Sequence, residues 1–233
     1  VMHINKKNLP KKILSWYDNN KRTLPWRISP KSKKNQYYRI LSEFMLQQTQ
    51  VKTVIPYFSN FIEKIPSLKA LSGSNGNKVL KLWEGLGYYR RAKNLHKTSK
   101  ILIKKYNGKL PDSFTKLKEL PGVGDYTANI LLALIYNQPR IGIDGNVKRV
   151  LFRLFNTNIL NLNNSFKTKR NNDLAEALME FGALICKPID PVCHECKINK
   201  MCSYYKLESK IKLKKKIKTK LKSYDIFCYL KKN

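Results

Sequence analysis

The chain has 233 residues and a formal net charge of +32, because 47 lysines and arginines outnumber 15 aspartates and glutamates. Hydrophobic residues make up 42% of the chain, which excludes a wholly disordered protein. No apolar run is long enough to cross a membrane, and the first residues lack the features of a signal peptide. We therefore expect a cytoplasmic protein with no membrane partner.

The positive charge predicts a nucleic-acid partner, since a surface this basic attracts the phosphate backbone whatever the base sequence. Compositional drift is the alternative explanation for part of the charge, because only nine of the basic residues are arginine. Charge therefore predicts nucleic-acid binding and says nothing about chemistry.

Helical periodicity dominates the sequence. Residues 37–55 place apolar side chains at spacings of three and four, and similar patterns recur at 78–86, 90–106, 126–136, 146–155 and 173–186. Seven prolines and glycines are expected to divide these patterns into short helices: Pro56, Pro66, Gly85, Gly87, Pro111, Gly122 and Gly142. No alternating strand pattern occurs before about Ser223, so the predicted fold class is all-α.

The last residues differ from the rest. Residues 212–222 interleave lysine with leucine and isoleucine, which is typical of a solvated linker or of a basic amphipathic helix on DNA. Residues 223–230 then have the character of a first β-strand. We interpret 209–233 as a basic linker and the start of a further domain.

A glycine turn joins two predicted helices at about residues 115–134. The first ends at Leu120 and Pro121, the chain turns through Gly122 and Gly124, and the second begins near Asp125. Glycines allow close approach of the backbone, and the free N–H groups of the second helix form a site for an anion. This pattern predicts a helix–hairpin–helix that holds a DNA phosphate at Gly122 and Gly124.

Four of the five cysteines lie within seventeen residues near the end of the chain, at Cys186, Cys193, Cys196 and Cys202. The gaps between them are six, two and five residues. In a reducing compartment such a group binds metal more often than it forms disulfides. The spacing by itself leaves zinc and an iron–sulfur cluster as equal alternatives.

Two carboxylates suggest glycosidic chemistry. Glu43 lies in an apolar helical pattern and is either on the wet face or buried with a raised pKa. Asp144 lies where a helix begins, either as a simple N-cap or as a carboxylate that helix N–H groups keep ionised. An acid and a carboxylate in contrasting environments are what hydrolysis of a glycosidic bond requires, and a DNA base would first have to leave the duplex.

Six motifs occur in an order that closely resembles the MutY family of adenine DNA glycosylases, within the helix–hairpin–helix superfamily that includes endonuclease III. They are LPWR (24–27), LSEFMLQQTQVKTVIPYF (41–58), LWEGLGYYRRAKNLH (82–96), LPGVGDYTA (120–128), IDGNVKRVL (143–151) and the cysteine group. The resemblance implies a two-lobed fold, with a six-helix barrel at 23–137 and an iron–sulfur cluster lobe formed by 1–22 and 138–208. Double-stranded DNA would bind in the cleft between them.

The resemblance also implies a base-excision-repair enzyme that acts as a monomer on DNA. It would flip out and hydrolyse adenine mispaired with guanine or 8-oxoguanine and leave an abasic site, with at most weak lyase activity. The implied catalytic residues are Glu43, Asp144, Tyr126 and Asn146. The implied substrate-binding residues are Trp26, Arg27, Leu46 and Glu176 at the adenine, and Gln47, Gln48 and Tyr88 in the duplex. Lys148 would meet the DNA and could react adventitiously with the abasic sugar.

The cysteine gaps match the family's pattern for a 4Fe-4S cluster. Cys186, Cys193, Cys196 and Cys202 are then the ligands, Cys228 lies outside the set, and His194 is a solvent-facing bystander. The family usually continues into a C-terminal domain that recognises 8-oxoguanine, and this chain ends where that domain would begin. We therefore expect a smaller preference for 8-oxoguanine than a full-length relative shows.

Three other functions remain as alternatives. An endonuclease III-like enzyme for damaged pyrimidines would carry a nucleophilic lysine where this chain has Tyr126, and would not use Glu43. A thymine–guanine mismatch glycosylase would keep the tyrosine without needing Glu43. A non-catalytic iron–sulfur DNA-binding protein would need neither acid.

Overall fold

The computed structural model describes residues 8–156 and 166–206, and every regular element in these ranges is a helix. The helices are α1 (Asn8–Asn20), α2 (Asn35–Leu46), α3 (Val51–Lys64), α4 (Leu68–Gly73), α5 (Gly76–Lys81), α6 (Arg90–Tyr106), α7 (Phe114–Lys118), α8 (Asp125–Tyr136), α9 (Gly145–Phe155), α10 (Asn171–Leu184), the short 3-10 helix η1 (Asn199–Met201) and α11 (Ser203–Lys206). The all-α prediction is confirmed for this part of the chain. The predicted linker and strand at 209–233 lie outside the described residues.

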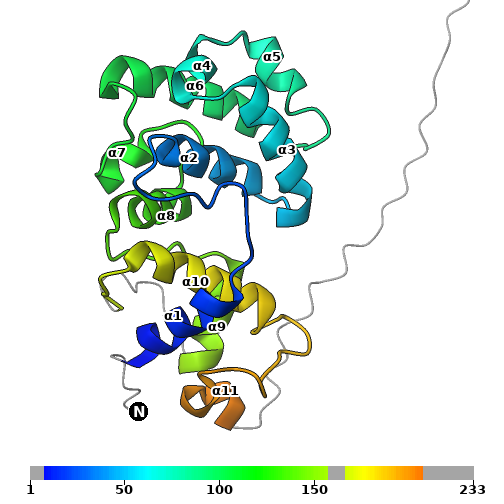
Figure 1. The fold of residues 1–233 in the computed structure, drawn as a ribbon, viewed down its shortest axis with the longest axis vertical. Helices are drawn as coiled ribbons and strands as arrows, with labels where there is room; N and C mark the ends of the chain where they lie inside the picture. Colours follow the sequence, from blue (N-terminus) through cyan, green and yellow to red (C-terminus); the bar gives the residue numbers. More distant parts are fainter. Residues whose placement is uncertain (1–7, 157–165, 207–233) are drawn as a thin grey trace, which may run out of the picture.

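The helices form two lobes, each around its own hydrophobic core (Figure 1). Helices α2 to α8 surround the first core, in which Phe44, Phe58 and Trp83 are fully buried. Helices α1, α9 and α10 surround the second core, so the beginning of the chain packs against a segment far along it. Two lobes were expected from the sequence, but boundaries at residues 22 and 138 stay a prediction.

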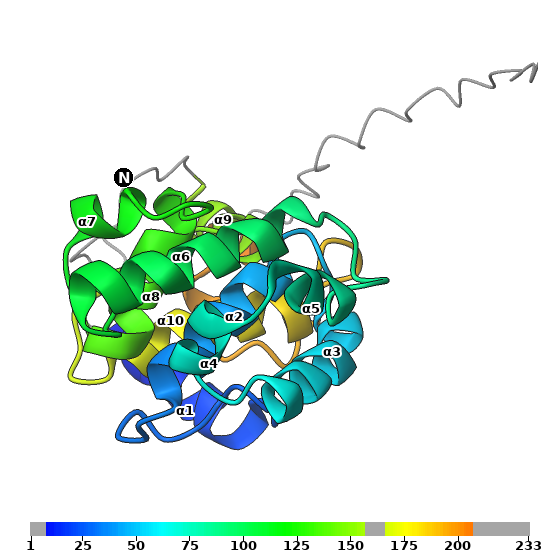
Figure 2. The ribbon, with the colours of Figure 1, turned by 90° about the horizontal axis from the view of Figure 1, so that it is seen from above.

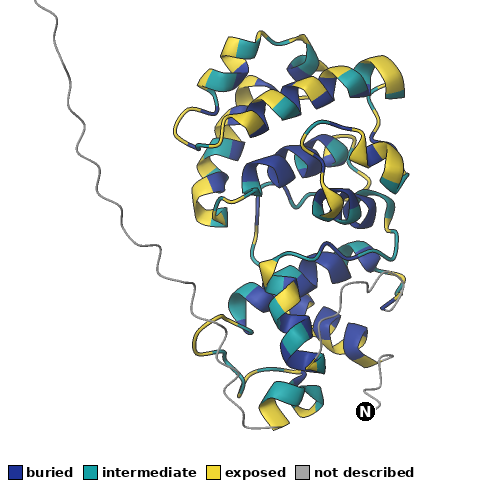
Figure 3. Ribbon diagram, turned by 180° about the vertical axis from the view of Figure 1, so that it is seen from behind, coloured by how far each residue is buried: buried dark blue, intermediate teal, exposed yellow. Residues whose placement is uncertain are grey.

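Buried residues lie on the helix faces that turn into each lobe, and exposed residues lie on the outer faces (Figure 3). Within residues 8–156 and 166–206, no helix combines the length and the apolar character that crossing a bilayer requires.

Helix α2 lies in the middle of the first lobe, in contact with α3, α6 and α8 (Figure 2). Because neighbours cover it on several sides, its polar side chains Asn35, Arg39, Ser42 and Glu43 are buried along with its apolar ones. The fold thus removes a carboxyl group from water in the interior of a lobe, which is the condition for a raised pKa.

The helical pattern at 37–55 is wrong at one point, because the chain turns between α2 and α3. Helix α2 ends at Leu46, and Gln48 has a φ of +58°, in the left-handed region that stops a right-handed helix. No glycine or proline marks this turn. The carbonyl groups at the end of α2 instead accept hydrogen bonds from the distant Arg91.

Pro56 was expected to divide the helical pattern, and it does not. It lies inside α3, which continues to Lys64. A proline in a helix removes one N–H donor. Helix α3 nevertheless buries Val54, Phe58 and Phe61 completely, and burial of these side chains holds the helix together.

The predicted glycine turn is present between α7 and α8. Gly122 has a φ of +82°, and a Cβ atom there would lie 2.8 Å from Phe44, so only glycine fits. Gly124 is the N-cap of α8, and it is exposed. The backbone N–H groups at the start of α8 are thus accessible from outside.

A small apolar seam joins the two lobes. Ile130, Ala133 and Leu134 of α8 pack against Ala175 of α10, with Tyr126 and Met179 at the edge. Gly182 of α10 lets the start of α9 approach closely, since a Cβ there would lie 2.7 Å from Asn146 Cβ. This contact fixes the beginning of α9 beside α10, where the site described below lies.

Candidate active site

A pocket of about 710 Å³ opens between the lobes. Its wall combines the end of α2, the following turn, and residues of α8, α9 and α10. Ten residues that the sequence analysis singled out line it: Trp26, Arg27, Glu43, Leu46, Gln47, Gln48, Tyr126, Asp144, Asn146 and Glu176. The fold therefore brings residues as far apart in the sequence as Trp26 and Glu176 to one cavity.

Glu43 is the buried acid of this pocket, with 6% of its surface exposed. Burial raises the pKa of its carboxyl group to about 7, and the negative charges of Glu176 and Asp144 add to the effect. The positive charge of Arg39 opposes it. Of the two alternatives for Glu43, the buried position with a raised pKa is the one observed, so the group can carry a proton near neutral pH.

Tyr126 lies beside Glu43 at the first turn of α8. Its hydroxyl group interacts with the Glu43 carboxyl and lies 3.3 Å from Met179 Sδ. Burial, together with the charges of Glu43 and Asp144, raises the pKa of Tyr126 well above its usual value. The phenol therefore stays neutral and can donate a hydrogen bond into the pocket.

Asp144 is the N-cap of α9, as predicted. Its Oδ1 accepts a hydrogen bond of 2.7 Å from the backbone N–H of Val147, and its Oδ2 accepts one of 3.1 Å from Asn146 Nδ2. These two donors fix the plane of the carboxylate. Asp144 thus faces the pocket as an oriented carboxylate whose partners come from its own helix.

Arg149 supports this arrangement from behind. It donates to Asn146 Oδ1 at 2.7 Å, to the carbonyl of Gly182 at 2.7 Å, and to the carbonyl of Cys186 at 2.7 Å. Since Asn146 in turn donates to Asp144, one chain of hydrogen bonds runs from the first cysteine of the group to the carboxylate. No pattern in the sequence marks Arg149.

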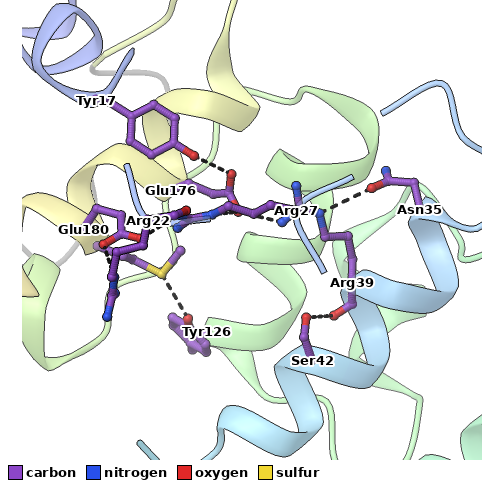
Figure 4. A network of polar contacts seen from close by, with 10 residues as sticks. Tyr17, Arg22, Arg27, Asn35, Arg39, Ser42, Tyr126, Glu176 and Glu180 are labelled. Atoms are coloured by element: carbon purple, nitrogen blue, oxygen red, sulfur yellow. Dashed lines mark hydrogen bonds and ion pairs between the residues drawn. The ribbon is translucent and has the colours of Figure 1, made fainter. Parts of the chain in front are cut away.

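Glu176 contrasts with Glu43. Its Oε1 accepts hydrogen bonds from Arg39 at 2.5 Å and Arg27 at 3.1 Å, and its Oε2 accepts one from the hydroxyl of Tyr17 at 2.7 Å (Figure 4). Burial opposes ionisation here as well, but Arg39 and Arg27 outweigh it and hold the pKa of Glu176 below its usual value. Glu176 is therefore a paired carboxylate with both oxygens engaged.

Glu180, one turn further along α10, completes the network. It pairs with Arg22 at 2.8 Å and with Arg27 at 2.6 Å, and only 1% of its side chain is exposed. Arg22, Arg39 and Glu180 were not predicted from the sequence. The available signal was a pair of glutamates four residues apart among the apolar residues that follow Asp173, because such a pair needs cations around it when it is buried.

Trp26 and Leu46 line the pocket from the first lobe. Trp26 is 3% exposed, and its ring meets that of Phe58 edge-on at 5.3 Å between centroids. Leu46 is partly buried at the end of α2. Trp26 is thus also ordinary core packing, which leaves only the edge of its side chain for a ligand.

Three predicted DNA-contacting residues lie at the mouth of the pocket or outside it. Gln48 lies on the turn after α2, and Tyr88 is 63% exposed with a φ of +50°. Lys148 is exposed on α9, one turn beyond Asp144. None of the three is in the buried part of the site, so each can meet a ligand larger than the pocket.

The four predicted cysteine ligands surround a second, much smaller cavity. Cys186, Cys193, Cys196 and Cys202 are unpaired, and they line it together with apolar side chains of α9 and α10. Arg153 lies 3.5 Å from Cys186 Sγ and donates to the carbonyls of Lys187 and Pro188. Four thiols around one apolar cavity beside an arginine fit a group that carries negative charge and takes thiolate ligands.

In the described part of the chain, no three His, Cys, Asp or Glu side chains are arranged to hold a single metal ion. His194 is exposed and pairs with Glu195 at 3.2 Å, away from the cavity. Cys228 lies outside the described residues.

The chain is similar to several known proteins. It is 42% identical over 207 residues to an adenine DNA glycosylase of Buchnera aphidicola subsp. Baizongia pistaciae, a match that covers 83% of this chain and 57% of the relative. An adenine DNA glycosylase of Mus musculus is 37% identical over 83% of this chain and 41% of the relative. The chain thus spans about half the length of the curated relatives it matches.

Solved structures match the fold. A thermostable thymine-DNA glycosylase superimposes with a TM-score of 0.76 at 26% identity, covering 87% of this chain and 97% of the other. Endonuclease III in a non-covalent DNA complex superimposes with a TM-score of 0.71 at 21% identity, over 89% and 98%. The sequence profile of the HhH-GPD superfamily matches residues 41–170. This chain belongs to the HhH-GPD superfamily of base excision DNA repair proteins.

Proposed function

We propose that the protein is an adenine DNA glycosylase that removes adenine mispaired with guanine or 8-oxoguanine and leaves an abasic site. The observation that carries this proposal is the environment of Glu43: an acid whose pKa is raised to about 7 shares one pocket with the oriented carboxylate of Asp144. The similarity to curated adenine DNA glycosylases supports the choice of base.

Breaking an N-glycosidic bond leaves positive charge on the sugar and negative charge on the departing base. In the proposed reaction Glu43 gives its proton to the adenine ring as the bond to the sugar breaks, so the base leaves as a neutral molecule. Asp144 stabilises the cationic sugar. Water then attacks the sugar carbon, and its proton passes to the Glu43 carboxylate, which restores the starting state.

Tyr126 decides between hydrolysis and strand cleavage. A lyase attacks the sugar with an amine, forms a Schiff base and then cuts the strand. A neutral phenol beside Glu43 cannot form a Schiff base, so the main product is an intact strand with an abasic site. This argues against the endonuclease III-like alternative, in which a lysine would occupy position 126.

The substrate in this proposal is double-stranded DNA with the adenine turned out into the pocket. Trp26, Arg27, Leu46 and Glu176 would form the adenine site, with Glu176 acting through the arginines it binds. Gln47, Gln48 and Tyr88 would enter the duplex, and Gly122, Gly124 and Lys148 would hold phosphates. A monomer suffices, because every residue named here comes from one chain.

The cysteine cavity would hold a 4Fe-4S cluster through Cys186, Cys193, Cys196 and Cys202. The cluster would supply structural support, because a metal group that needs four thiolates ties the loop from Cys186 to Cys202 to α9 and α10. Purified protein should then be yellow-brown with four irons per chain. One mole of zinc without visible absorbance would contradict this part of the proposal.

A panel of duplexes that differ only in one base pair tests the function. Adenine opposite guanine or 8-oxoguanine should yield abasic sites, revealed as strand breaks only after alkali, whereas adenine opposite thymine should not. Asp144→Asn should lose excision while still binding the duplex. Release of thymine or of a damaged pyrimidine in place of adenine, or strand breaks at the same rate without alkali, would overturn the proposal.

A further inference from the structure

Arg91, at the second position of α6, is a buried cation without an acidic partner. Only 6% of its surface is exposed, and none of the ion pairs between described residues includes it. A buried charge is costly unless something replaces the water around it. Here the replacement is the backbone of two other segments.

The two terminal nitrogens of the guanidinium group lie within hydrogen-bond distance of five backbone carbonyl oxygens. The acceptors are Phe44 (3.2 Å), Met45 (2.6 Å) and Gln47 (2.6 Å) for one terminal nitrogen, and Leu86 (3.2 Å) and Gly87 (3.0 Å) for the other. The first three carbonyls are at the end of α2, where the helix dipole also favours a positive charge. Arg91 therefore binds the end of α2 and the loop before α6 to each other.

Each segment that Arg91 holds leads directly into a conformationally strained residue. Gln48 follows Gln47 and has a φ of +58°, and Tyr88 follows Gly87 and has a φ of +50°. A left-handed backbone conformation is unfavourable for both glutamine and tyrosine, and it persists only where the surrounding structure imposes it. The bonds from Arg91 are the constraint that both residues share.

Two aromatic rings also contact the guanidinium group of Arg91. The guanidinium carbon lies 5.4 Å from the centre of the buried Trp83 ring and 5.4 Å from the centre of the Tyr88 ring. Gln47 also donates to the carbonyl of Gly122 at 3.2 Å, which links the same turn to the glycine turn between α7 and α8. Three segments that would face DNA are thus joined around one side chain.

We propose that Arg91 is a positioning residue that holds Gln48 and Tyr88 as one preformed wedge for opening the duplex at the target adenine. This inference rests on the proposed function, since it assumes that these residues enter DNA. A wedge that is rigid before binding loses little conformational entropy when it enters DNA. More of the binding free energy is then available to unstack the base. Arg91 itself need not touch DNA.

The test compares one enzyme on two duplexes. The first carries adenine opposite guanine, which must be unpaired before excision. The second carries adenine opposite a stable abasic-site analogue, where there is no pair to break. Arg91→Lys keeps the charge but cannot reach five carbonyls, so single-turnover excision should fall roughly tenfold or more on the first duplex and less than about threefold on the second.

Arg140→Lys is the matched control. Arg140 also lies 5.4 Å from an aromatic ring, that of Phe114, and binds a neighbouring polar group, Asn129 Oδ1, at 3.2 Å. It is not part of the pocket, so the ratio between the two duplexes should equal that of the wild type. A variant that is merely less stable, with Gln48 and Tyr88 still held in place, would lower the excision rates on both duplexes by the same factor.

A second readout does not depend on chemistry. A duplex with 2-aminopurine beside the mispaired adenine should fluoresce more strongly when the wild-type protein binds and unstacks it, and Arg91→Lys should abolish the increase. If the wild type unstacks the probe but releases no adenine, the proposed function fails and this inference survives. If the wild type does not unstack it, this inference fails.

Gly87→Ala provides an independent route if Arg91→Lys does not fold. Gly87 has a φ of +75°, and no neighbouring atom lies within 4 Å of the place that a Cβ would take, so alanine would alter only the backbone of the loop that carries Tyr88. The same selective loss on the paired adenine is expected. Equal losses on both duplexes for either variant, with the fluorescence increase intact, would overturn the proposal.

Discussion

Glu43 and Glu176 line the same pocket, and each leaves 6% of its surface exposed. The wall around Glu43 offers one opposing cation, Arg39, and two carboxylates, so the pKa of Glu43 rises to about 7. The wall around Glu176 offers Arg39, Arg27 and the hydroxyl of Tyr17, so the pKa of Glu176 falls. Burial is the same in both places, and the neighbouring charges decide which glutamate can act as an acid.

The largest expected effect is on catalysis at the Glu43 side. Glu43→Gln keeps the shape but has no acidic proton to give, so excision of adenine should fall roughly a thousandfold, within the range for a general acid. Affinity for the mispaired duplex should change little, because the substitution removes a proton donor and leaves the surface as it is. Single-turnover excision and equilibrium binding measure the two quantities. A loss of binding that matches the loss of rate would remove Glu43 from the chemical step.

The second-largest expected effect is on stability, and its sign is opposite for the two glutamates. Glu176→Gln leaves Arg27 and Arg39 with less negative charge, and breaking a buried pair in this way costs about 3–5 kcal/mol of the free energy of unfolding. Glu43→Gln should instead stabilise the protein at pH 8, by about 3 kcal/mol, because the buried wild-type carboxyl is ionised there at a cost.

The effect of Glu43→Gln on stability also depends on pH. A raised pKa means that the folded protein holds the Glu43 proton more tightly, so this contribution is intact below about pH 4.5 and is lost as the pH rises to about 7. The gain from Glu43→Gln should therefore be present at pH 8 and absent at pH 4.5. Thermal unfolding at both pH values measures it. The exposed Glu119→Gln serves as a control that leaves the melting temperature close to that of the wild type; a Glu43→Gln protein less stable than wild type at pH 8 would contradict the comparison.

The third effect is the pH dependence of excision. Glu43 acts in its protonated form, so the rate should fall above about pH 7, approaching roughly tenfold for each further pH unit. Single-turnover rates from about pH 5.5 to about pH 9 measure this limb, with duplex binding followed over the same range. A rate that stays constant to the upper end of this range would show that the proton comes from another group.

The sequence predicts the contrast only in part. The sequence left two positions open for Glu43, one on the wet face and one buried, and the structure shows the buried one. The helix start after Asp144 indicated an N-cap, which is observed. The pairing of Glu176 with Arg39 and Arg27 was not predicted, because Arg39 belongs to a helical pattern and Arg27 to a short motif, and neither pattern reveals a partner more than a hundred residues away. Arg91 had no signal that separated it from its exposed neighbour Arg90.

The same limit explains the helix boundary. The turn at Gly122 was predicted correctly from its own residues, whereas Pro56 was wrongly expected to end a helix. The turn at residues 47–50 was missed, since its cause is the side chain of Arg91 on another helix. Local chemistry is therefore predictable from the sequence here, whereas a constraint that arrives from a distant segment requires the fold.

The smallest expected effect is at Tyr126, which adjusts the acid without replacing it. The hydroxyl group of Tyr126 interacts with the Glu43 carboxyl and favours its ionised form, and so lowers the pKa of Glu43 against the effect of burial. Tyr126→Phe should raise that pKa, so the falling limb of the rate should move to higher pH by less than about one unit. The rate below about pH 7 should drop severalfold through poorer positioning, and the ratio of variant to wild type should increase with pH. Tyr136→Phe is the matched control on the same helix: the hydroxyl group of Tyr136 donates to the carbonyl of Leu110, outside the pocket, and its removal should leave the limb in place. A limb that moves to lower pH in Tyr126→Phe would mean that the tyrosine stabilises the protonated acid, and the difference between the two glutamates would then rest on the arginines alone.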